Sequence, residues 1–246
     1  MKTAREIIER AQVQLVLKNR LSWEEDCFGG RFHTVEERQR QQSLESSLIS
    51  SQCLDRIMDT NDWTLLNQRI GTIDMKCRAW RAFECEVIEP LLWACGLVIK
   101  LTPIGKFSLA NFGRLLVDTP TYDLCQTAIL RDQDQILRQR NIFMLWYWRC
   151  QRHQEFDGVK GNSVISAIAK EFTSQVVVCA KSIKRINGDF AVFGKPFSEI
   201  TQMEKCLLGL RARWRYHALE WVLNNESWYN TCTGTWNSAK PGKDGA

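Results

Sequence analysis

Apolar side chains recur every three or four residues from Ile165 to Ile186, and this spacing limits what that part of the chain can form. Because an α-helix turns once in 3.6 residues, the spacing places these side chains on one helix face. It predicts a single helix that ends at Asn187-Gly188, two residues that accept a left-handed helix cap. The alternative is a strand over residues 175–179 followed by a hairpin at Asn187-Gly188. The apolar positions are Ile165, Ile168, Phe172, Val176, Cys179, Ile183 and Ile186.

Other helix starts are marked by three Thr-x-x-Glu pairs, at Thr3, Thr34 and Thr201. In such a capping box each of the two side chains binds a backbone N–H of the first turn. Two further stretches have helical spacing, and Pro90 in one of them marks a kink or a first turn. The predicted helices run from Thr3 to Gly29-Gly30, from 34 to about 58, over 74–95 with its end at Gly96, over 122–154, and over 200–224.

These elements predict an all-α fold with little or no β-structure, in which six to eight helices form one compact domain over residues 1–237. The composition agrees, because 44% of the residues are hydrophobic and 25% are charged, as in globular proteins. Residues 238–246 read as a disordered tail. The remaining predictions are a turn at 59–62, loops at 101–107 and 118–123, and an extended segment at 189–197.

The ends and the cysteines of the chain bear on its compartment. The N-terminal residues are charged from the start, and the longest apolar run, from Ile142 to Trp148, is short. Neither a secretory signal nor a membrane span is therefore expected. The ten cysteines are scattered singly, which is typical of reduced, buried thiols. We expect a cytoplasmic protein.

Tryptophans crowd into the run from Arg213 to Asn230, with His217 among them. Trp214 and Trp221 share a helix face with aliphatic residues, which favours burial in a core. The alternative is a platform of exposed rings that stacks a base or a sugar. On such a face His217 is expected to be a hydrogen-bonded core residue.

The sequence lacks the familiar motifs for catalysis and cofactor binding: it has no glycine-rich nucleotide loop, no nucleophile elbow and no HExxH pair. Cys150-x-x-His153 is half of a zinc pattern with no matching second pair, so neither metal nor cofactor is predicted. The candidate pocket or interface residues are polar or aromatic groups on apolar helices: Arg131, Arg215, His217, Trp221 and Trp228.

Three stretches, in this order and spacing, resemble a bacterial family defined only as domain of unknown function 4272. They are Glu86–Leu97, Leu130–Trp148 and Asp189–Thr235, and the most specific parts are Leu92-Trp93-Ala94-x-Gly96 and Arg215-x-x-Ala218-Leu219-x-Trp221. The resemblance covers residues 31–235. It implies a mainly helical fold and no particular activity, since none is established for the family.

The chain departs from the family pattern at several acidic positions. Where the family carries three carboxylates after the last helix, this chain has Tyr229, Asn230 and Gly234. An aspartate and an arginine of the family's long helix correspond to Asn141 and Leu145. Any metal or acid–base chemistry of those acidic residues would be lost here.

Three functions remain, in order of preference. The first is a protein-interaction or accessory, immunity-type factor without catalysis, because Trp, Tyr and Arg are the residues that anchor interfaces. The second is an enzyme with a pocket where Arg131, Arg215 and His217 converge. The third is a weak nucleic-acid binder, since the net charge of +5 comes from the C-terminal half. It requires one exposed surface made of Lys181, Lys184, Arg185, Arg211, Arg213 and Arg215.

Overall fold

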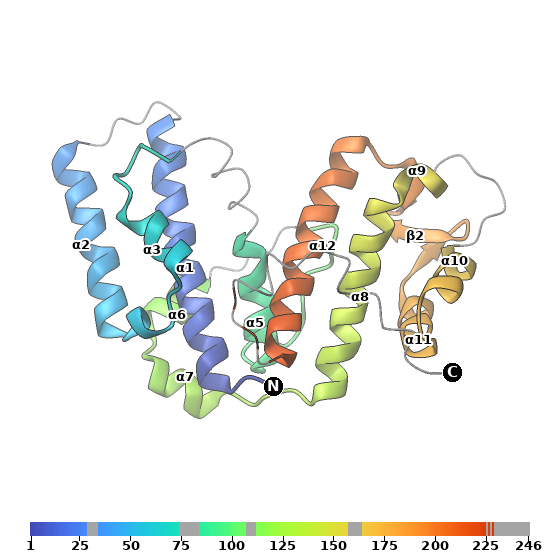
Figure 1. The fold of residues 1–246 in the computed structure, drawn as a ribbon, viewed down its shortest axis with the longest axis horizontal. Helices are drawn as coiled ribbons and strands as arrows, with labels where there is room; N and C mark the ends of the chain where they lie inside the picture. The colour runs from blue at the N-terminus through green and yellow to red at the C-terminus, as the bar shows by residue number, and fades with distance from the viewer. Residues whose placement is uncertain are drawn as a thin grey trace. The chain divides into compact units, whose positions relative to one another are not determined.

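The computed structural model describes residues 1–28, 34–73, 84–106, 112–156, 164–224, 226 and 228 (Figure 1). Contacts within the chain divide it into two compact units. Unit 1 comprises residues 1–101 and 108–131, and unit 2 comprises residues 102–107 and 132–246. The single domain predicted over 1–237 stays a prediction, and 238–246 lie outside the described residues.

The described secondary structure of unit 1 is entirely helical. Two short 3-10 helices, η1 (Leu54–Arg56) and η2 (Glu84–Val87), connect or precede longer elements. The α-helices are α1 (Ala4–Phe28), α2 (Val35–Ser51), α3 (Thr60–Asn67), α5 (Ile88–Ala94), α6 (Phe112–Asp118) and α7 (Thr121–Thr127).

Unit 2 combines helices with a small antiparallel sheet of strand order β1-β2-β3. The strands are β1 (Arg185–Ile186), β2 (Asp189–Val192) and β3 (Lys195–Pro196), followed by the 3-10 helix η3 (Phe197–Glu199). The α-helices are α8 (Gln133–Gln151), α9 (His153–Phe156), α10 (Val164–Glu171), α11 (Ser174–Ser182) and α12 (Gln202–Leu223).

The fold is thus mostly helical with little β-structure, as predicted, but the predicted number of helices is wrong. The described residues contain eleven α-helices rather than six to eight, together with three short strands. The larger count arises because several predicted long helices are interrupted, for reasons described below.

Helix α1 is the buried centre of unit 1. Every residue from Ile7 to Leu17 is buried, and the helix packs against α3, α5, α6 and α7. The apolar stripe of Ile7, Ile8 and Ala11 covers only one face, so the other faces bring polar side chains into the interior. Buried charges require partners, and α1 therefore depends on ion pairs with its neighbours.

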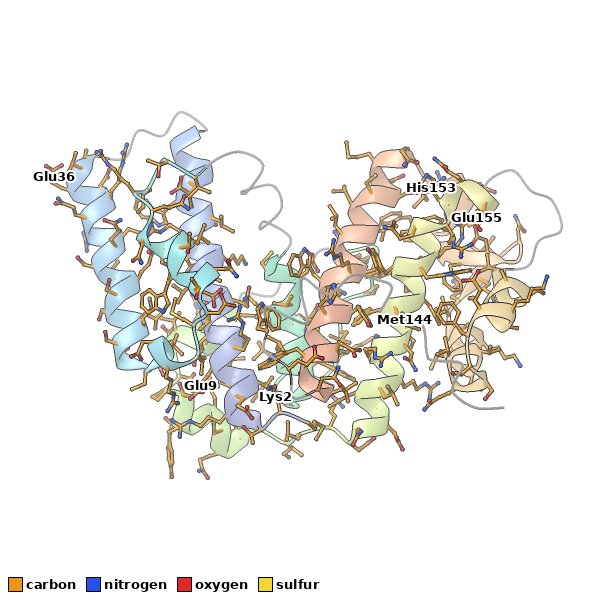
Figure 2. All side chains as sticks on the ribbon, viewed as in Figure 1. Lys2, Glu9, Glu36, Met144, His153 and Glu155 are labelled. Atoms are coloured by element: carbon orange, nitrogen blue, oxygen red, sulfur yellow. The ribbon has the colours of Figure 1, made fainter. Side chains whose placement is uncertain are left out.

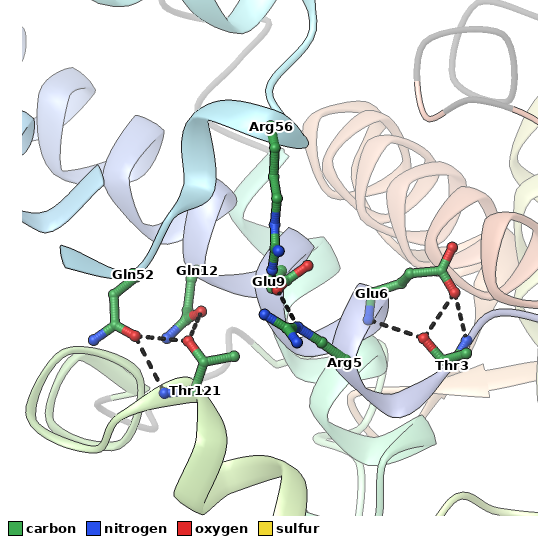
Figure 3. A network of polar contacts seen from close by, with 8 residues as sticks. All are labelled: Thr3, Arg5, Glu6, Glu9, Gln12, Gln52, Arg56 and Thr121. Atoms are coloured by element: carbon green, nitrogen blue, oxygen red, sulfur yellow. Dashed lines mark hydrogen bonds and ion pairs between the residues drawn. The ribbon is translucent and has the colours of Figure 1, made fainter. Parts of the chain in front are cut away.

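Two of these ion pairs lie in the first half of α1. The buried Glu9 carboxylate accepts a hydrogen bond from Arg5 at 2.8 Å and pairs with Arg56 of η1 (Figure 3). One turn from Arg5, Arg10 donates through Nη1 to Asp62 Oδ2 of α3 at 2.6 Å, and both side chains are buried. These pairs fix η1 and α3 against α1.

Arg20 provides a third anchor further along α1. It pairs with Glu45 of α2 at 3.0 Å and donates to the backbone carbonyls of Leu66 and Gln68 at the end of α3. Burial raises the pKa of Glu45, although the Arg20 charge acts in the opposite direction. One guanidinium thus holds two helices through both a carboxylate and helix-end carbonyls.

A polar side chain from elsewhere caps α7. Its N-cap residue, Pro120, has no side-chain oxygen, so it cannot bind the first amides of the helix. Gln52, at the end of α2, supplies the acceptor instead: its Oε1 accepts from the Thr121 amide at 3.1 Å (Figure 3). The Thr121 hydroxyl also reaches Gln52 and Gln12 of α1. The start of α7 is therefore set by tertiary contacts.

Gly96 ends α5 as predicted, with a φ of 72° in the left-handed region. A Cβ at this position would lie 2.5 Å from the Ile129 carbonyl oxygen. The close approach exists because the Ile129 amide donates to the Cys95 carbonyl at 2.9 Å and the Arg131 amide to the Ala94 carbonyl at 3.0 Å. These bonds hold residues 129–131 outside any helix, which interrupts the predicted helix over 122–154.

The other interruptions also follow from caps. Asp132 caps α8 by accepting from the Gln135 amide at 2.8 Å, which separates α8 from α7. The last residues of the long predicted helix form α9 after a break at Arg152. The predicted turn at 59–62 is instead the start of α3, where Asp59 forms a capping box with Asp62. The helix predicted to reach about residue 58 ends at Ser51.

Helices α8 and α12 of unit 2 run side by side in opposite directions (Figure 1). At one end Gly209 of α12 meets Cys150 of α8, where a Cβ on the glycine would lie 3.2 Å from the cysteine Cβ. At the other end Arg140 of α8 pairs with Glu220 of α12 at 2.8 Å. The small glycine permits close packing at one end of the helix pair, and an ion pair joins the two helices at the other end.

Two buried arginines of α12 fasten a distant loop. Arg211 donates to the Ile104 carbonyl at 2.7 Å, and Arg215 donates to the Thr102 carbonyl at 2.6 Å. Gly105 in the same loop lies so close to Val192 of β2 that an added Cβ would meet it at 2.8 Å. The predicted loop at 101–107 is therefore bound between α12 and the sheet in its described part.

The prediction of a single helix from Ile165 to about Ile186 is wrong. This stretch forms α10, then α11 and then β1. The two helices are separated at Thr173, the N-cap of α11, which has extended backbone. Asn187 and Gly188 both have positive φ, 51° and 81°, and join β1 to β2 as the alternative predicted, with the dihedral signs of a type I′ turn. The alternative strand over 175–179 is helical. The extended segment predicted at 189–197 is confirmed as β2 and β3.

The carboxylate of Asp189 holds the hairpin to α8. It accepts from Arg149 Nε at 2.9 Å and Nη2 at 2.8 Å, and from the amides of Phe190 and Ser198. Burial alone would raise the pKa of Asp189, but the Arg149 charge and these donors outweigh it, so the pKa is lowered. One side chain therefore connects α8, β2 and η3.

Replacing Asp189 with Asn should lower the free energy of unfolding by roughly 3–5 kcal/mol, because it removes the carboxylate from a buried ion pair. Urea unfolding measures the change. The matched control is Glu155→Gln on α9 (Figure 2), which breaks the exposed pair with Arg152 and should cost less than about 1 kcal/mol. Equal effects in the two variants would contradict the role of burial.

A second comparison separates backbone strain from steric overlap. Gly96→Ala should destabilise the protein by more than Gly188→Ala, because both glycines have positive φ but only Gly96 has an atom in contact with the added Cβ. Gly188→Ala should cost about 1 kcal/mol from the left-handed backbone alone. Thermal unfolding measures both, and a larger loss in Gly188→Ala would refute the close contact at Gly96.

Candidate functional site

The aromatic run of α12 is buried. Trp214 and Trp221 are largely inaccessible, and Trp221 contacts the buried Trp228 edge-on at a ring-centroid distance of 5.5 Å. Exposed rings are what a stacking platform requires. The core interpretation of Trp214 and Trp221 is therefore confirmed.

His217 lies between aromatic rings, 5.2 Å from the Tyr216 ring and 6.2 Å from the Trp214 ring. Its side chain is 7% exposed, and Nε2 accepts a hydrogen bond from Arg213 Nε at 3.4 Å. Burial, and then the Arg213 charge, lower the pKa of His217 to about 4. The imidazole is therefore neutral at pH 7 and accepts a proton only in acid.

The three residues of the enzyme hypothesis have different hydrogen-bond partners. Arg215, fully buried in unit 2, donates to Thr102, while Arg131 belongs to unit 1. Neither of them nor His217 lines the pocket described below. The proposed convergence of Arg131, Arg215 and His217 has no support from these contacts.

The surface required for nucleic-acid binding is not formed as predicted. Arg211 and Arg215 are buried and donate to backbone carbonyls, and Arg213 is half-buried beside His217. Only Lys181, Lys184 and Arg185 of the six predicted residues are exposed. Part of the positive charge of the C-terminal half is thus buried inside unit 2, where it binds backbone carbonyls.

The half-buried Arg131 forms a cluster with the half-buried Trp93 at the end of α5. Its guanidinium lies over the Trp93 ring, 4.6 Å from the centroid. Nε donates to the Trp93 carbonyl, and Nη2 donates to the carbonyls of Val98 and Ile99. The guanidinium thereby joins residues 93–99 to residue 131, while Nη1 stays outside these bonds.

Two large apolar side chains near Arg131 in the structure or the sequence are exposed to solvent: Ile99, whose carbonyl accepts from Arg131, and Ile129, two residues before it. Ile99 is 90% exposed and Ile129 is 79% exposed, and Lys100 beside them is also exposed. We call Trp93, Ile99, Lys100, Ile129 and Arg131 the Arg131 surface. The sequence pattern identified Arg131 but not the two isoleucines, and for Ile129 the reason is that the helix predicted over 122–154 hid its exposure.

A pocket of about 340 Å³ lies between α8 and α12 within unit 2. Its volume is within the range of small-molecule sites. Residues at steps of three or four along α12 form one wall, a spacing that could have been found in the sequence. The lining residues are Tyr147, Cys150, Gln151, His153, Gln202, Lys205, Cys206, Gly209, Leu210 and Arg213.

The polar groups of the pocket differ in what they can do. His153 Nδ1 is 3.0 Å from the Cys150 carbonyl, and because a carbonyl only accepts, this nitrogen carries the proton. Burial raises the pKa of the Cys150 thiol to about 12, so it is not a nucleophile at pH 7. The Cys206 thiol is exposed and accepts from Gln202 at 3.8 Å.

Comparisons with protein-family models, curated proteins and solved structures found no match. The resemblance to the bacterial family of unknown function stays a prediction. Within the described ranges, no helix combines the length and apolar character of a membrane crossing. The same ranges contain no group of three or more His, Cys, Asp and Glu side chains suited to hold a metal ion.

The pKa of His217 predicts a specific pH dependence of stability. The unfolded chain protonates this histidine below about pH 6.5 and the folded chain only below about pH 4. Between these values the unfolded state binds more protons, so stability falls as the pH drops, by up to about 3 kcal/mol in total.

Urea unfolding from pH 7 to pH 4.5 measures this effect. His217→Gln keeps an acceptor for Arg213 but does not titrate, so its stability should decline less steeply than that of the wild type. Carboxylates that titrate in this range contribute to both proteins alike, and the difference isolates His217. Parallel curves would show that the histidine is not buried in its neutral form.

Proposed function

We propose that this chain is a protein-interaction factor, an accessory or immunity-type component that acts by binding another protein. The observation that carries the proposal is the Arg131 surface, where an arginine stacked on a tryptophan lies beside two isoleucines exposed to solvent. Arg and Trp are the residue types most enriched among those that dominate binding energy. Exposed apolar side chains beside them supply the area that a partner would cover.

The surface is also rigid, which favours binding. Backbone hydrogen bonds join residues 94–95 to residues 129–131, and the Arg131 side chain adds three more bonds to carbonyls. A surface that is already ordered loses little conformational entropy when a partner binds. The proposed interface therefore needs no rearrangement of this part of unit 1.

The charges of the surface indicate the chemistry of the partner. Lys100 is exposed and Arg131 Nη1 makes none of the bonds described above, so both can meet carboxylates. We propose a partner protein that presents apolar side chains to Ile99 and Ile129 and an acidic group to Arg131. Charge complementarity of this kind speeds association and selects the partner.

The proposal includes two further expectations from the sequence, membership of the domain of unknown function 4272 family and a cytoplasmic location. The seven cysteines whose side chains the structure describes are all free, including the exposed Cys53 and Cys206. Free exposed thiols are typical of a reducing compartment, which supports the second expectation.

The experiment compares two double variants of the full chain as bait in a lysate of the native cell. Ile99→Ser/Ile129→Ser should lose the captured partner, because a pair of central interface side chains contributes on the order of 2 kcal/mol or more. Val35→Ser/Leu44→Ser makes the same chemical change on exposed positions of α2 and should retain it. A photo-crosslinking amino acid at position 99 should label the same partner.

Purified partner then allows a quantitative test by calorimetry. The Ile99/Ile129 variant should raise the Kd by roughly 30-fold or more, and the Val35/Leu44 variant should leave it unchanged. If both variants bind like the wild type, or if nothing crosslinks to position 99, the Arg131 surface is not the interface.

A further inference from the structure

We infer that the small sheet of unit 2 binds single-stranded nucleic acid, with a base stacked on Phe193 and phosphates held by exposed cations around the sheet. We call Lys106, Lys184, Arg185, Phe193 and Lys195 the hairpin surface. All five belong to unit 2, whereas the Arg131 surface belongs to unit 1. The two surfaces have different ligands, so this inference can fail without affecting the proposed protein interaction.

Phe193 occupies a turn position that folding alone does not favour. Phe193-Gly194 is the two-residue turn between the paired Val192 and Lys195, and its two φ values are positive, 53° and 77°. Such turns favour Asn-Gly, because a left-handed backbone strains a bulky side chain. The other turn of the same sheet is indeed Asn187-Gly188. A phenylalanine at the equivalent position indicates that its ring serves a purpose other than folding.

The ring of Phe193 is both exposed and held in place. The residue is 52% exposed, while one edge of the ring lies against Gly105, where an added Cβ would be 3.0 Å from Cε1. The loop that contains Gly105 is fixed by the two buried arginines of α12 described above. A fixed, solvent-exposed aromatic ring is what base stacking requires, and such stacking tolerates any base.

Two exposed lysines lie next to this ring along the chain. Lys195 directly follows the turn, and Lys106 directly follows Gly105. Neither forms an ion pair with a described residue. Hydrogen bonds from Thr201 lower the pKa of Glu204 most, and the nearby Lys195 charge lowers it further. Because Thr201 already donates to that carboxylate through its amide and hydroxyl, Glu204 offsets the Lys195 charge only in part.

Two more exposed cations lie on the β1 side of the sheet. Arg185 belongs to β1, and the carbonyl of the preceding Lys184 accepts from the Ala191 amide of β2 at 2.9 Å. The β1 and β3 strands come within 8 Å of each other, Cα to Cα, so the cations of both edges are close together. The carboxylate of β2, on Asp189, is engaged by Arg149 inside unit 2.

This combination of groups favours nucleic acid over an acidic protein. Four cations outnumber the two carboxylates that follow β3, Glu199 and Glu204, and lysines are depleted in protein interfaces but bind phosphates well. A ring beside cations matches bases that alternate with phosphates. The nucleic acid must be single-stranded, because bases in a duplex are stacked on one another. Only Lys184 and Arg185 are shared with the nucleic-acid surface predicted from the sequence.

A fluorescein-labelled oligothymidylate of about ten nucleotides is the probe for the full chain. Fluorescence anisotropy at about 50 mM salt should give a Kd of roughly 10 µM, within the range of non-specific binding. Three or four phosphate contacts should make the affinity fall by roughly 20- to 50-fold when the salt is raised to about 200 mM. Absence of binding at roughly 100 µM protein, or an affinity independent of salt, would overturn the inference.

Phe193→Asn separates stacking from folding. Asparagine is a residue that this turn favours, so the melting temperature should stay the same or rise, while the affinity for the oligothymidylate should fall by about tenfold. Phe193→Tyr keeps an aromatic ring and should bind like the wild type. If Phe193→Asn binds as tightly as the wild type, no base is stacked on this ring and the inference is wrong.

Two double variants with the same charge change locate the phosphate contacts. Lys184→Gln/Arg185→Gln should weaken binding by about tenfold and lower the salt dependence. Lys18→Gln/Arg40→Gln removes a lysine and an arginine from exposed positions of α1 and α2 in unit 1 and should keep the wild-type affinity. Equal losses in both variants would mean attraction by net charge alone and would refute the site.

Competition distinguishes nucleic acid from an acidic protein as the ligand. Unlabelled oligothymidylate should displace the probe, whereas polyglutamate of the same length should displace it far less, because a polypeptide carboxylate chain offers no base to stack on Phe193. Displacement by polyglutamate at the same concentration as unlabelled oligothymidylate would assign the hairpin surface to an acidic protein segment and overturn the inference.

Discussion

The structure depends on hydrogen-bond and ion-pair partners for the charged side chains of two helices that are buried on almost every side. In α1 every residue from Ile7 to Leu17 is buried, and in α12 the same is true of Arg211 to Leu219 except for Arg213. A helix with a polar face normally turns that face to water. Here the polar groups point into protein, so each neighbouring element must supply a carboxylate or a free backbone carbonyl.

This requirement explains how the neighbouring elements are positioned. Around α1, carboxylates come from the N-terminus of α3 and from α2, and carbonyls come from the end of α3. Around α12, the acceptors are carbonyls of the loop at 102–106. Carbonyls at helix ends and in loops lack partners in their own element, and arginine, with five donors, can bind several of them at once.

Local signals in the sequence were sufficient to predict where these helices begin or end. The capping boxes at Thr34 and Thr201 form as predicted, and Gly96 ends α5, because each of these devices involves residues at most a few positions apart. The breaks at 128–132 and at Thr173 were not predictable by spacing. The first is held by hydrogen bonds to Ala94 and Cys95, and the second preserves the three-four rhythm of apolar residues across two helices.

In the candidate site, too, some features followed from the local sequence and others did not. The burial of Trp214, Trp221 and His217 followed from their place on an apolar helix face. The exposure of Ile99 and Ile129 did not follow, because it depends on a non-helical segment held by Gly96 and Arg131. Net charge was misleading for a related reason: a sequence does not reveal that Arg211 and Arg215 bind carbonyls inside unit 2 rather than facing an acidic partner.

The loop that receives Arg211 and Arg215 has a consequence for biosynthesis. Thr102 and Ile104 precede their arginine partners by 113 and 107 positions, and the ribosome adds roughly 5–20 residues per second. When Arg131, the last residue of unit 1, has been synthesised, α12 has not yet been made and cannot bind this loop. For several seconds its carbonyls are hydrated, and unit 2 can close only after α12 has emerged.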